Sequence, residues 1–344
     1  MNEPHYTPRK GILVTGAAGF IGSTFLPIVR AKFPDVPLYA LDALTYAGLE
    51  SNLRELKQKL AGENAHISFH QIDITDSTAL AEFFERPEID TVVNFAAETH
   101  VDRSLSRPDV FFHTNLIGAV CLLKCAREAG VSRFIQISTD EVYGSTPEGE
   151  EFDETAPLNP SSPYAASKAA ADLAVLSYVN SYDFPALIVR GCNNYGPRQY
   201  PEKLIPFFVC RALEGKPLPL YGDGLHERDW IHARDFSAAV ALSLEYGADG
   251  EIYNVSGANR KTNVEITRRL IELTGATGID IEYVADRPGH DRRYRINCEK
   301  ISALGFSPRV DFRSGLKETV DWYVEHRERL KLLPEWERPL SGPN

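Results

Sequence analysis

The sequence is poor in cysteine, in positive charge and in long apolar segments. Its five cysteines are few and odd in number, which argues against a disulfide framework, so we expect a reducing, cytoplasmic environment. We expect no apolar stretch of transmembrane length, and residues 1–10 lack the apolar core of a signal peptide. Lysine and arginine number 37 against 48 acidic residues, an imbalance that disfavours nucleic-acid and membrane partners.

Length and composition are otherwise those of a globular protein. Hydrophobic residues make up 43% of the chain and charged residues 25%, which excludes the disordered and fibrous classes. A chain of 344 residues is long enough for one large α/β domain, or two smaller ones, with a substantial core.

Short apolar segments alternate with helical patterns through the first half of the chain. This alternation predicts a parallel sheet with helices on both faces, and the nearly continuous apolar character of the segments suits strands buried on both sides. We therefore predict a Rossmann-type doubly wound α/β fold, with functional groups at the C-terminal ends of the strands. The expected strands are residues 11–15, 38–41, 67–72, 91–95, 133–138 and 186–190, with helices that include 23–32, 115–129 and 165–181.

The pattern changes after Arg190, where glycine and proline become frequent up to residue 225. We predict a nucleotide-binding domain at 8–190 and a smaller, mixed α/β substrate-binding domain at 191–344, with 226–256 returning to the first domain. Further elements are expected as a strand at 251–255 and helices at 264–273 and 314–325.

A glycine-rich segment, Gly16-Ala-Ala-Gly19-Phe-Ile-Gly22, lies between the first strand and its helix. Glycines there let the backbone approach a pyrophosphate, and the helix N-terminus offers free N–H groups. Asp42 ends the second strand, where a carboxylate binds ribose hydroxyls and repels a 2′-phosphate. The segment predicts a dinucleotide site that prefers NAD over NADP, the alternative being an ordinary glycine turn and a surface aspartate.

Asp73 ends the third strand, and two interpretations of it stay open. Its carboxylate could bind the adenine amino group, or it could cap the helix that follows. No metal site is predicted. Cys121 and Cys125, four apart on an expected helix, are interpreted as buried cysteines rather than as a metal or redox pair.

Tyr164 and Lys168 lie one helical turn apart and project from one face of the expected helix. A tyrosine with a lowered pKa can remove a proton from a sugar hydroxyl while hydride leaves the same carbon. Lowering that pKa by about three units requires roughly 4 kcal/mol, which a nearby ammonium and an oxidised nicotinamide can supply. On its own the pair would be read as exposed residues of a surface helix.

Thr139-Asp140-Glu141 follows the expected strand at 133–138. Two neighbouring carboxylates split their proton affinities, so one can act as an acid and the other as a base. Neighbours in a strand point to opposite faces, so both acids serve one pocket only if the chain turns, as Gly144 permits. Without Tyr164 and Lys168, the pair would be read as solvated or helix-capping acids.

Six segments together resemble the extended short-chain dehydrogenase/reductase superfamily and, within it, the dTDP-glucose 4,6-dehydratase family. The similarity extends along nearly the whole chain, and a threonine followed by Asp-Glu is the mark of the dehydratases. The segments are residues 42–48, 96–104, 139–144, 193–197, 201–206 and 286–294.

The resemblance implies a three-step reaction on dTDP-glucose that yields a 4-keto-6-deoxy sugar nucleotide. Tyr164 removes the C4 hydroxyl proton, which Thr139 orients, while hydride passes to NAD. Glu141 takes the C5 proton and Asp140 protonates the departing C6 hydroxyl. Hydride then returns to C6, and Lys168 supports Tyr164 throughout.

The resemblance also assigns binding residues by position, and it implies a homodimer through the helices that contain Asn115 and Tyr164. The cofactor residues are Tyr164 and Lys168 of the catalytic set together with Gly16, Gly19, Phe20, Ile21, Gly22, Asp42, Leu44, Thr45, Asp73, Ile74 and Ala96. The substrate residues are Glu98, Thr99, Asn193, Lys203, Leu204, Arg228, Asn263, Arg287, His290 and Tyr294, within an arginine-rich segment that also includes Arg292 and Arg293.

Arg198, the pair Gly191-Cys192 and Leu49 differ from the residues usual in the family, and they leave the choice between thymine and uracil open. UDP-glucose 4,6-dehydratase is therefore the near alternative. A nucleotide-sugar 4-epimerase would use the same tyrosine and lysine but leaves the acid pair unexplained. A non-catalytic NAD-binding protein is the third alternative, because a fold does not determine a function.

Overall fold

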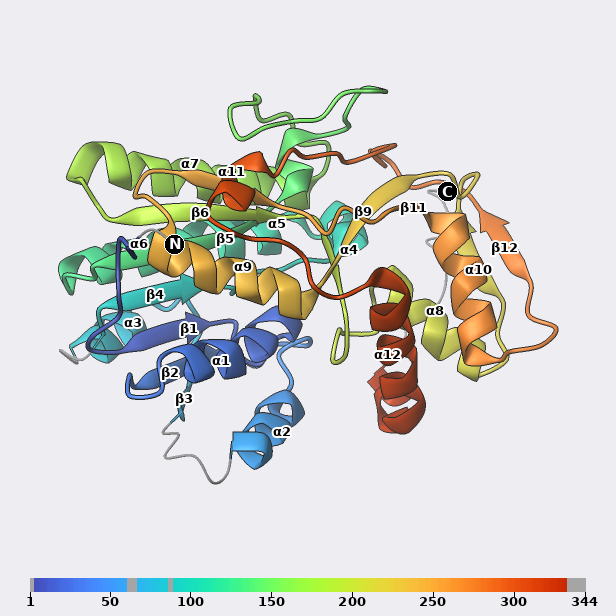
Figure 1. Ribbon diagram of the computed structural model, residues 1–344, viewed down its shortest axis with the longest axis horizontal. Helices are drawn as coiled ribbons and strands as arrows, with labels where there is room; N and C mark the ends of the chain where they lie inside the picture. The colour runs from blue at the N-terminus through green and yellow to red at the C-terminus, as the bar shows by residue number, and fades with distance from the viewer. Residues whose placement is uncertain (1–2, 61–66, 86–88, 333–344) are drawn as a thin grey trace.

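A computed structural model describes residues 3–60, 67–85 and 89–332. A parallel seven-stranded sheet forms its centre, with strand order β10-β6-β5-β4-β1-β2-β3 (Figure 1). The strands are β1 (Ile12–Thr15), β2 (Leu38–Asp42), β3 (Ile67–Gln71), β4 (Thr91–Asn94), β5 (Arg133–Thr139), β6 (Ala186–Gly191) and β10 (Ile252–Val255). The order reverses between β1 and β4, so a crevice opens there at the C-terminal ends of the strands.

Helices cover both faces of this sheet. One face packs on α1 (Phe20–Lys32) and α9 (Ala233–Tyr246), with α2 (Glu50–Leu60) beside α1. The other face packs on α3 (Ser77–Phe84), α6 (Ala119–Glu128) and α7 (Pro163–Tyr182). All the strands except the edge strand β3 therefore bury side chains, and helices on both faces confirm the predicted doubly wound α/β class.

A second, smaller region follows β6 and has its own apolar core. Two short sheets, of order β11-β9-β7 and β12-β8, pack with three helices there. The strands are β7 (Asn193–Tyr195), β8 (Leu218–Tyr221), β9 (Glu227–His232), β11 (Arg260–Thr262) and β12 (Ile281–Val284). The helices are α8 (Leu204–Leu213), α10 (Asn263–Thr274) and α12 (Phe312–Glu325).

Residues 226–256 divide between the two regions. Strand β9 belongs to the three-stranded sheet of the second region, whereas α9 packs on α1 and β10 pairs with β6 in the main sheet. The chain thus crosses from one region to the other within this segment. The remaining short elements are α4 (Val101–Ser106), α5 (Pro108–Phe112), the π-helix η1 (His113–Gly118), the 3-10 helices η2 (Asp140–Tyr143) and η3 (Arg327–Leu332), and α11 (Glu299–Ala303).

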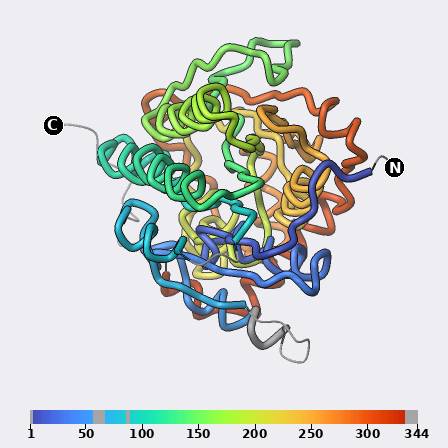
Figure 2. Tube along the Cα trace, turned by 90° about the vertical axis from the view of Figure 1, so that its left-hand side faces the viewer, coloured from blue at the N-terminus to red at the C-terminus, as the bar shows by residue number. Residues whose placement is uncertain are grey.

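The helical run formed by α5, η1 and α6 corrects one sequence expectation. Residues 108–128 are long and apolar enough, by length and composition alone, to cross a membrane, whereas we predict no such stretch from the sequence. In the fold this run lies along α7 (Figure 2), and α6 also packs on α3. Its most apolar stretch is 44% buried, and Phe112 and Ile117 on this run are exposed.

Candidate functional site

Two adjoining cavities lie at the C-terminal ends of the central strands. The first, which we call the glycine-loop cavity, has a volume of about 320 Å³ and is lined by the loop after β1. The second, the arginine cavity, measures about 460 Å³ and is lined mainly by the second region. The two cavities meet at Glu141, and the residues common to both linings are Glu141, Asn193, Glu202, Lys203, Leu204 and Trp230.

The loop after β1 needs glycine at two positions. Gly16 has a φ of +61°, and a Cβ there would lie 2.7 Å from the Ala96 nitrogen of the neighbouring strand end. A Cβ on Gly22, in the first turn of α1, would collide with the Gly16 carbonyl oxygen. The loop therefore brings bare backbone and the start of a helix to the cavity wall, an arrangement that suits a pyrophosphate.

Asp42 closes the other side of this loop. Its carboxylate accepts hydrogen bonds from the backbone N–H of Ala18 at 2.9 Å and of Leu44 at 2.8 Å. Burial raises the pKa of Asp42, while these N–H groups oppose that rise. Gly48 passes so close that a Cβ would strike the carboxylate. An acid held rigidly at this position suits ribose hydroxyls.

The structure brings nearly all the predicted cofactor residues to one cavity. Of the group named from the sequence, Leu44 alone is absent from the lining, because its side chain packs against the apolar core. Asp73 does line the cavity, and its carboxylate also accepts hydrogen bonds at 2.9 Å from the backbone N–H and the hydroxyl of Thr75. The cap of α3 is Asp76, so the capping alternative for Asp73 was wrong.

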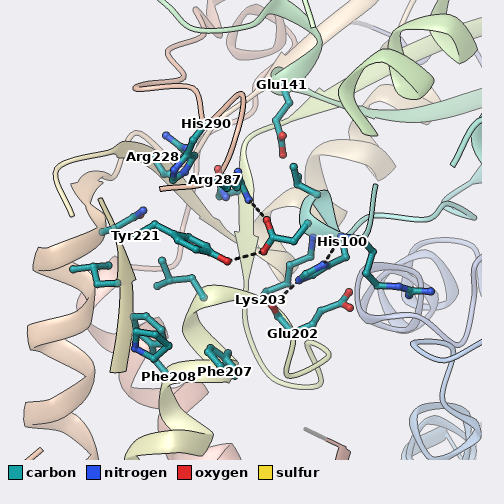
Figure 3. A pocket seen from close by; sticks show the side chains of 18 of the residues that line it. His100, Glu141, Glu202, Lys203, Phe207, Phe208, Tyr221, Arg228, Arg287 and His290 are labelled. Atoms are coloured by element: carbon teal, nitrogen blue, oxygen red, sulfur yellow. Dashed lines mark hydrogen bonds and ion pairs between the residues drawn. The ribbon is translucent and has the colours of Figure 1, made fainter. Parts of the chain in front are cut away.

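The chain turns immediately after β5, as the two acids require. Thr139 ends the strand and caps η2, its hydroxyl accepting the Glu141 N–H at 3.3 Å. The turn closes at Gly144, whose φ is +74° and whose Cβ position is occupied by the Asn159 carbonyl. Asp140 and Glu141 then both line the glycine-loop cavity, and Glu141 also points into the arginine cavity (Figure 3).

The two acids differ in their environments. Burial, followed by repulsion from Glu141, raises the pKa of Asp140 well above its usual range. Burial also raises the pKa of Glu141, but the cations Arg287, Lys203 and Arg228 oppose that rise. Asp140 is therefore the better proton donor and Glu141 the better base, a division that fits an acid and a base acting on one substrate.

Tyr164 and Lys168 project from α7 beside this turn. The Tyr164 side chain is buried, and its pKa is raised first by that burial and then by the charges of Glu141 and Asp140. The Lys168 ammonium donates a 2.6 Å hydrogen bond to the Ile137 carbonyl oxygen of β5, and burial lowers its pKa to about 8. A tyrosine in this setting needs added positive charge before it can act as a base.

Cations line the arginine cavity, and two of them, Arg103 and Arg287, form ion pairs with Glu98 and Asp102. Arg287 donates to Asp102 at 3.2 Å, and the Tyr221 hydroxyl donates to the other oxygen of Asp102 at 3.2 Å (Figure 3). Arg228 donates to the Asp291 and Glu227 carbonyl oxygens at 2.9 and 2.7 Å. Fixed guanidinium groups next to Lys203 suit a diphosphate.

The structure separates two arginines from this group. Arg292 forms a bidentate ion pair with Asp223, with N–O distances of 2.8 and 3.0 Å. Arg293 lies near Glu148 and Glu227. Neither lines the arginine cavity. Both arginines contact acids outside that lining, and their part in a diphosphate site stays a prediction.

His226, Asp286 and His290 form a compact cluster beside the arginine cavity. The histidine rings stack with centroids 3.7 Å apart and planes 13° apart, and Asp286 contacts their nitrogens at 3.2 and 2.6 Å. Two nearly parallel rings cannot both direct a lone pair at one ion, whereas both can donate to a shared carboxylate. We therefore interpret the cluster as hydrogen-bonded support for His290, which lines the cavity.

Sequence reasoning missed several residues that line the site. Tyr46, Glu202, His100 and Asp102 all border a cavity and lie inside the segments that carried the family resemblance. The family resemblance therefore indicated their positions, but their roles depend on contacts between distant segments. Tyr221 lay outside those segments and was not signalled.

Three comparisons with known proteins place the chain among its relatives. A family model described as GDP-mannose 4,6 dehydratase matches residues 13–319. The low-salt glycan biosynthesis protein Agl12 of Haloferax volcanii is 46% identical over 91% of this chain and 98% of its own length. The dTDP-glucose 4,6-dehydratase of an Actinoplanes species is 45% identical over 92% of this chain and 98% of its own length.

A solved structure agrees with these sequence relatives. The dTDP-glucose 4,6-dehydratase of Streptomyces venezuelae, solved with NAD and dTDP bound, is 46% identical to this chain. It superimposes with a TM-score of 0.87, covering 92% of this chain and 98% of its own.

The fold and the site define an NAD-dependent enzyme of the extended short-chain dehydrogenase/reductase class. Two features of this chain fit NAD in particular: the backbone cradle at Gly16 and Gly22, and the buried Asp42 beside it. The chain belongs to the GDP-mannose 4,6 dehydratase family, and dTDP-glucose 4,6-dehydratases are among its near relatives.

Proposed function

We propose that this protein converts dTDP-glucose to dTDP-4-keto-6-deoxyglucose. The observation that carries the proposal is the turn at Thr139, which brings Asp140 and Glu141 to the cavity that also contains Tyr164. A plain dehydrogenase or a 4-epimerase needs the tyrosine and lysine but not a second acid and base. The relatives named dTDP-glucose 4,6-dehydratase support the same reaction for this chain.

The residues divide the work of three steps. When bound, NAD accepts a hydride from C4 and later returns it to C6. Tyr164 removes the C4 hydroxyl proton, and the Thr139 hydroxyl orients that group. The 4-ketone acidifies C5, so Glu141 removes the C5 proton while Asp140 protonates the leaving C6 hydroxyl. The raised pKa of Asp140 keeps a proton available for that role.

The arginine cavity supports a nucleotide diphosphate as the carrier of the sugar. Lys203, Arg228 and Arg287 supply positive charge, and Asn193, Asn263 and His290 add polar groups to the same lining. Rates measured side by side with dTDP-glucose, UDP-glucose and GDP-mannose test the base preference. Turnover of dTDP-glucose at least about tenfold faster than of the others, on the order of 1.4 kcal/mol, is expected.

The reaction is tested with dTDP-glucose carrying deuterium at C4, in ordinary water. We expect a 4-keto-6-deoxy product with the deuterium at C6, because the same bound cofactor takes and returns the hydride. Deuterium recovered at C4 of an epimerised sugar would identify a 4-epimerase instead. Bound NAD with an unchanged sugar would identify a non-catalytic protein.

We also propose a homodimer built on α7 and the run α5–η1–α6. Phe112, Ile117 and Leu173 are 37%, 46% and 57% exposed on these neighbouring helices, an apolar surface suited to self-association. Light scattering should give a dimer that Leu173→Asp converts to monomer. Tyr283→Asp, at an equally exposed site on β12, should leave the mass unchanged.

We propose a cytoplasmic location for this enzyme. All five cysteines are free, and three of them are buried in separate parts of the structure. Free thiols of this kind are typical of a reducing compartment.

A further inference from the structure

A buried ion pair lies beside Tyr164 and Lys168 and has no place in the mechanism above. Asp172 is fully buried and Arg190 is 2% exposed. One oxygen of Asp172 accepts hydrogen bonds from Arg190 Nε at 2.9 Å and from the Ser138 hydroxyl at 3.0 Å. Buried pairs add little net stability over apolar residues of similar size, so their presence calls for another reason.

Asp172 shares a helix face with the two catalytic residues. It lies four residues after Lys168 and eight after Tyr164 on α7, so all three project in the same direction. Lys168 donates to the carbonyl of Ile137, and Asp172 accepts from the hydroxyl of the next residue, Ser138. The ammonium and the carboxylate therefore approach consecutive residues of β5.

Asp172 is the acid whose charge acts on Lys168, and both residues lie on α7. Lys168 shares the face of α7 that also presents Tyr164 and Asp172, and its ammonium donates to the Ile137 carbonyl oxygen of β5. Asp140 and Glu141 of η2 lie on the side of Tyr164, and Arg190 of β6 is bonded to Asp172. Burial lowers the pKa of Lys168 to about 8, and the Asp172 carboxylate opposes that fall. With little water nearby, a charge several ångströms away acts strongly.

We propose that Asp172 is a positioning residue whose negative charge keeps Lys168 protonated, and that Arg190 and Ser138 hold Asp172 in place for this purpose. The proposal rests on the roles assigned above to Tyr164 and Lys168. Lys168 must be cationic when Tyr164 becomes a phenolate, because the cation stabilises the phenolate. The simpler alternative is that Asp172 only neutralises Arg190 inside the core.

The test measures the ionisation of Lys168 without any substrate. The holoenzyme is labelled with acetic anhydride over a pH series, and the Lys168 peptide is quantified by mass spectrometry, since only the neutral amine reacts. Asp172→Asn keeps the size of the side chain and one acceptor oxygen. We expect its pH of half-labelling to fall by about one unit or more. Ser138→Ala removes one hydrogen bond but no charge and should shift it far less.

The double variant Asp172→Asn/Arg190→Gln separates the two alternatives and guards against misfolding. It removes both charges, so no uncompensated arginine is left in the core. If Asp172 acts on Lys168, the double variant still labels at the lower pH. If Asp172 only neutralises Arg190, labelling returns to that of the unmodified protein, and the proposal is overturned.

A kinetic measurement links the shift to the reaction. The alkaline limit of C4 oxidation, followed by NADH absorbance, should move down with the labelling curve in Asp172→Asn, and Asp172→Glu should restore it partly. An unchanged labelling curve in folded Asp172→Asn rejects the proposal whatever the activity is. Absence of turnover in every variant, with the labelling shift present, would instead count against the proposed function.

Discussion

The Tyr46 hydroxyl donates a 3.0 Å hydrogen bond to Glu202, joining the loop after β2 to the segment before α8. Both residues line the glycine-loop cavity. The Arg103 guanidinium lies 3.8 Å from the centre of the Tyr46 ring, and Tyr200 packs edge-on against it at 5.3 Å. The contact therefore ties the loop after β2 to the segment before α8 at the wall of the glycine-loop cavity.

Removing this hydrogen bond should loosen the cofactor. A dehydratase of this kind must keep its reduced cofactor until the hydride is returned, so retention matters for the product. Tyr46→Phe removes a hydrogen bond that contributes about 1 kcal/mol to the closed loop, so the affinity for NAD should fall roughly fivefold. We expect correspondingly less NAD to remain after gel filtration, measured from the absorbance of the released nucleotide.

Tyr200→Phe is the matched control for Tyr46→Phe. Tyr200 lines the same cavity and packs against the Tyr46 ring. Within the described part of the chain, its hydroxyl forms no hydrogen bond. Equal retention of NAD by both variants would mean that the Tyr46 hydroxyl does not hold the loop closed.

Asp140→Asn should separate oxidation at C4 from loss of water at C6. The amide cannot supply the proton that the departing hydroxyl needs, whereas Tyr164 remains in place. We expect elimination to slow by about a hundredfold or more. In a stopped-flow experiment, NADH absorbance should then persist, whereas Tyr164→Phe should suppress its appearance. Unaltered turnover of Asp140→Asn would show that the acid has been wrongly assigned.

Gly22→Ala should weaken NAD binding and also destabilise the protein. In most helices alanine is more stable than glycine by about 1 kcal/mol, so the ordinary expectation is a gain. Here the added methyl group meets the Gly16 carbonyl oxygen. Thermal melting with and without NAD should show a lower melting temperature and a smaller rise on adding NAD. A stabilised variant with normal NAD binding would contradict this geometry.

The central fold could be predicted from the sequence because its signals are local. Six apolar segments gave six strands of the main sheet to within one or two residues at each end. The turn at 139–144 was also foreseeable, since only a glycine such as Gly144 adopts its backbone angle without strain. Helix 163–182 followed from its pattern in the same way.

The rest depended on contacts between distant parts of the chain. Arginine clustering in the sequence did not show that Arg292 would pair with Asp223, some seventy residues earlier in the chain. The run at 108–128 was not expected to reach transmembrane length, although its length and mean hydropathy are those of a membrane-spanning helix. The Asp172–Arg190 pair could not be predicted either, because nothing in the local sequence marks two buried charges as partners.

Asp140 should lower the free energy of unfolding as the pH rises. A carboxylate in a salt bridge has the reverse effect, because its pKa in the folded state is lowered. The pKa of Asp140 in the folded state is raised by burial and by Glu141, so folding favours the protonated form. Below the unfolded pKa, at about pH 4, both states are protonated and no difference arises. Above it the unfolded state releases the proton more readily, and stability is lost until the pH passes the folded pKa.

Asp140→Asn removes this loss, so its melting temperature relative to the unmodified protein should increase as the pH is raised. Differential scanning calorimetry across a pH series measures that difference, and its trend with pH is the quantity that matters, because the new amide has its own packing cost. The exposed acid Glu82 gives the control, and Glu82→Gln should show no such trend. A difference that stays constant or shrinks with rising pH would mean that Asp140 is ionised at little cost in the folded protein, and it would then be a poor proton donor.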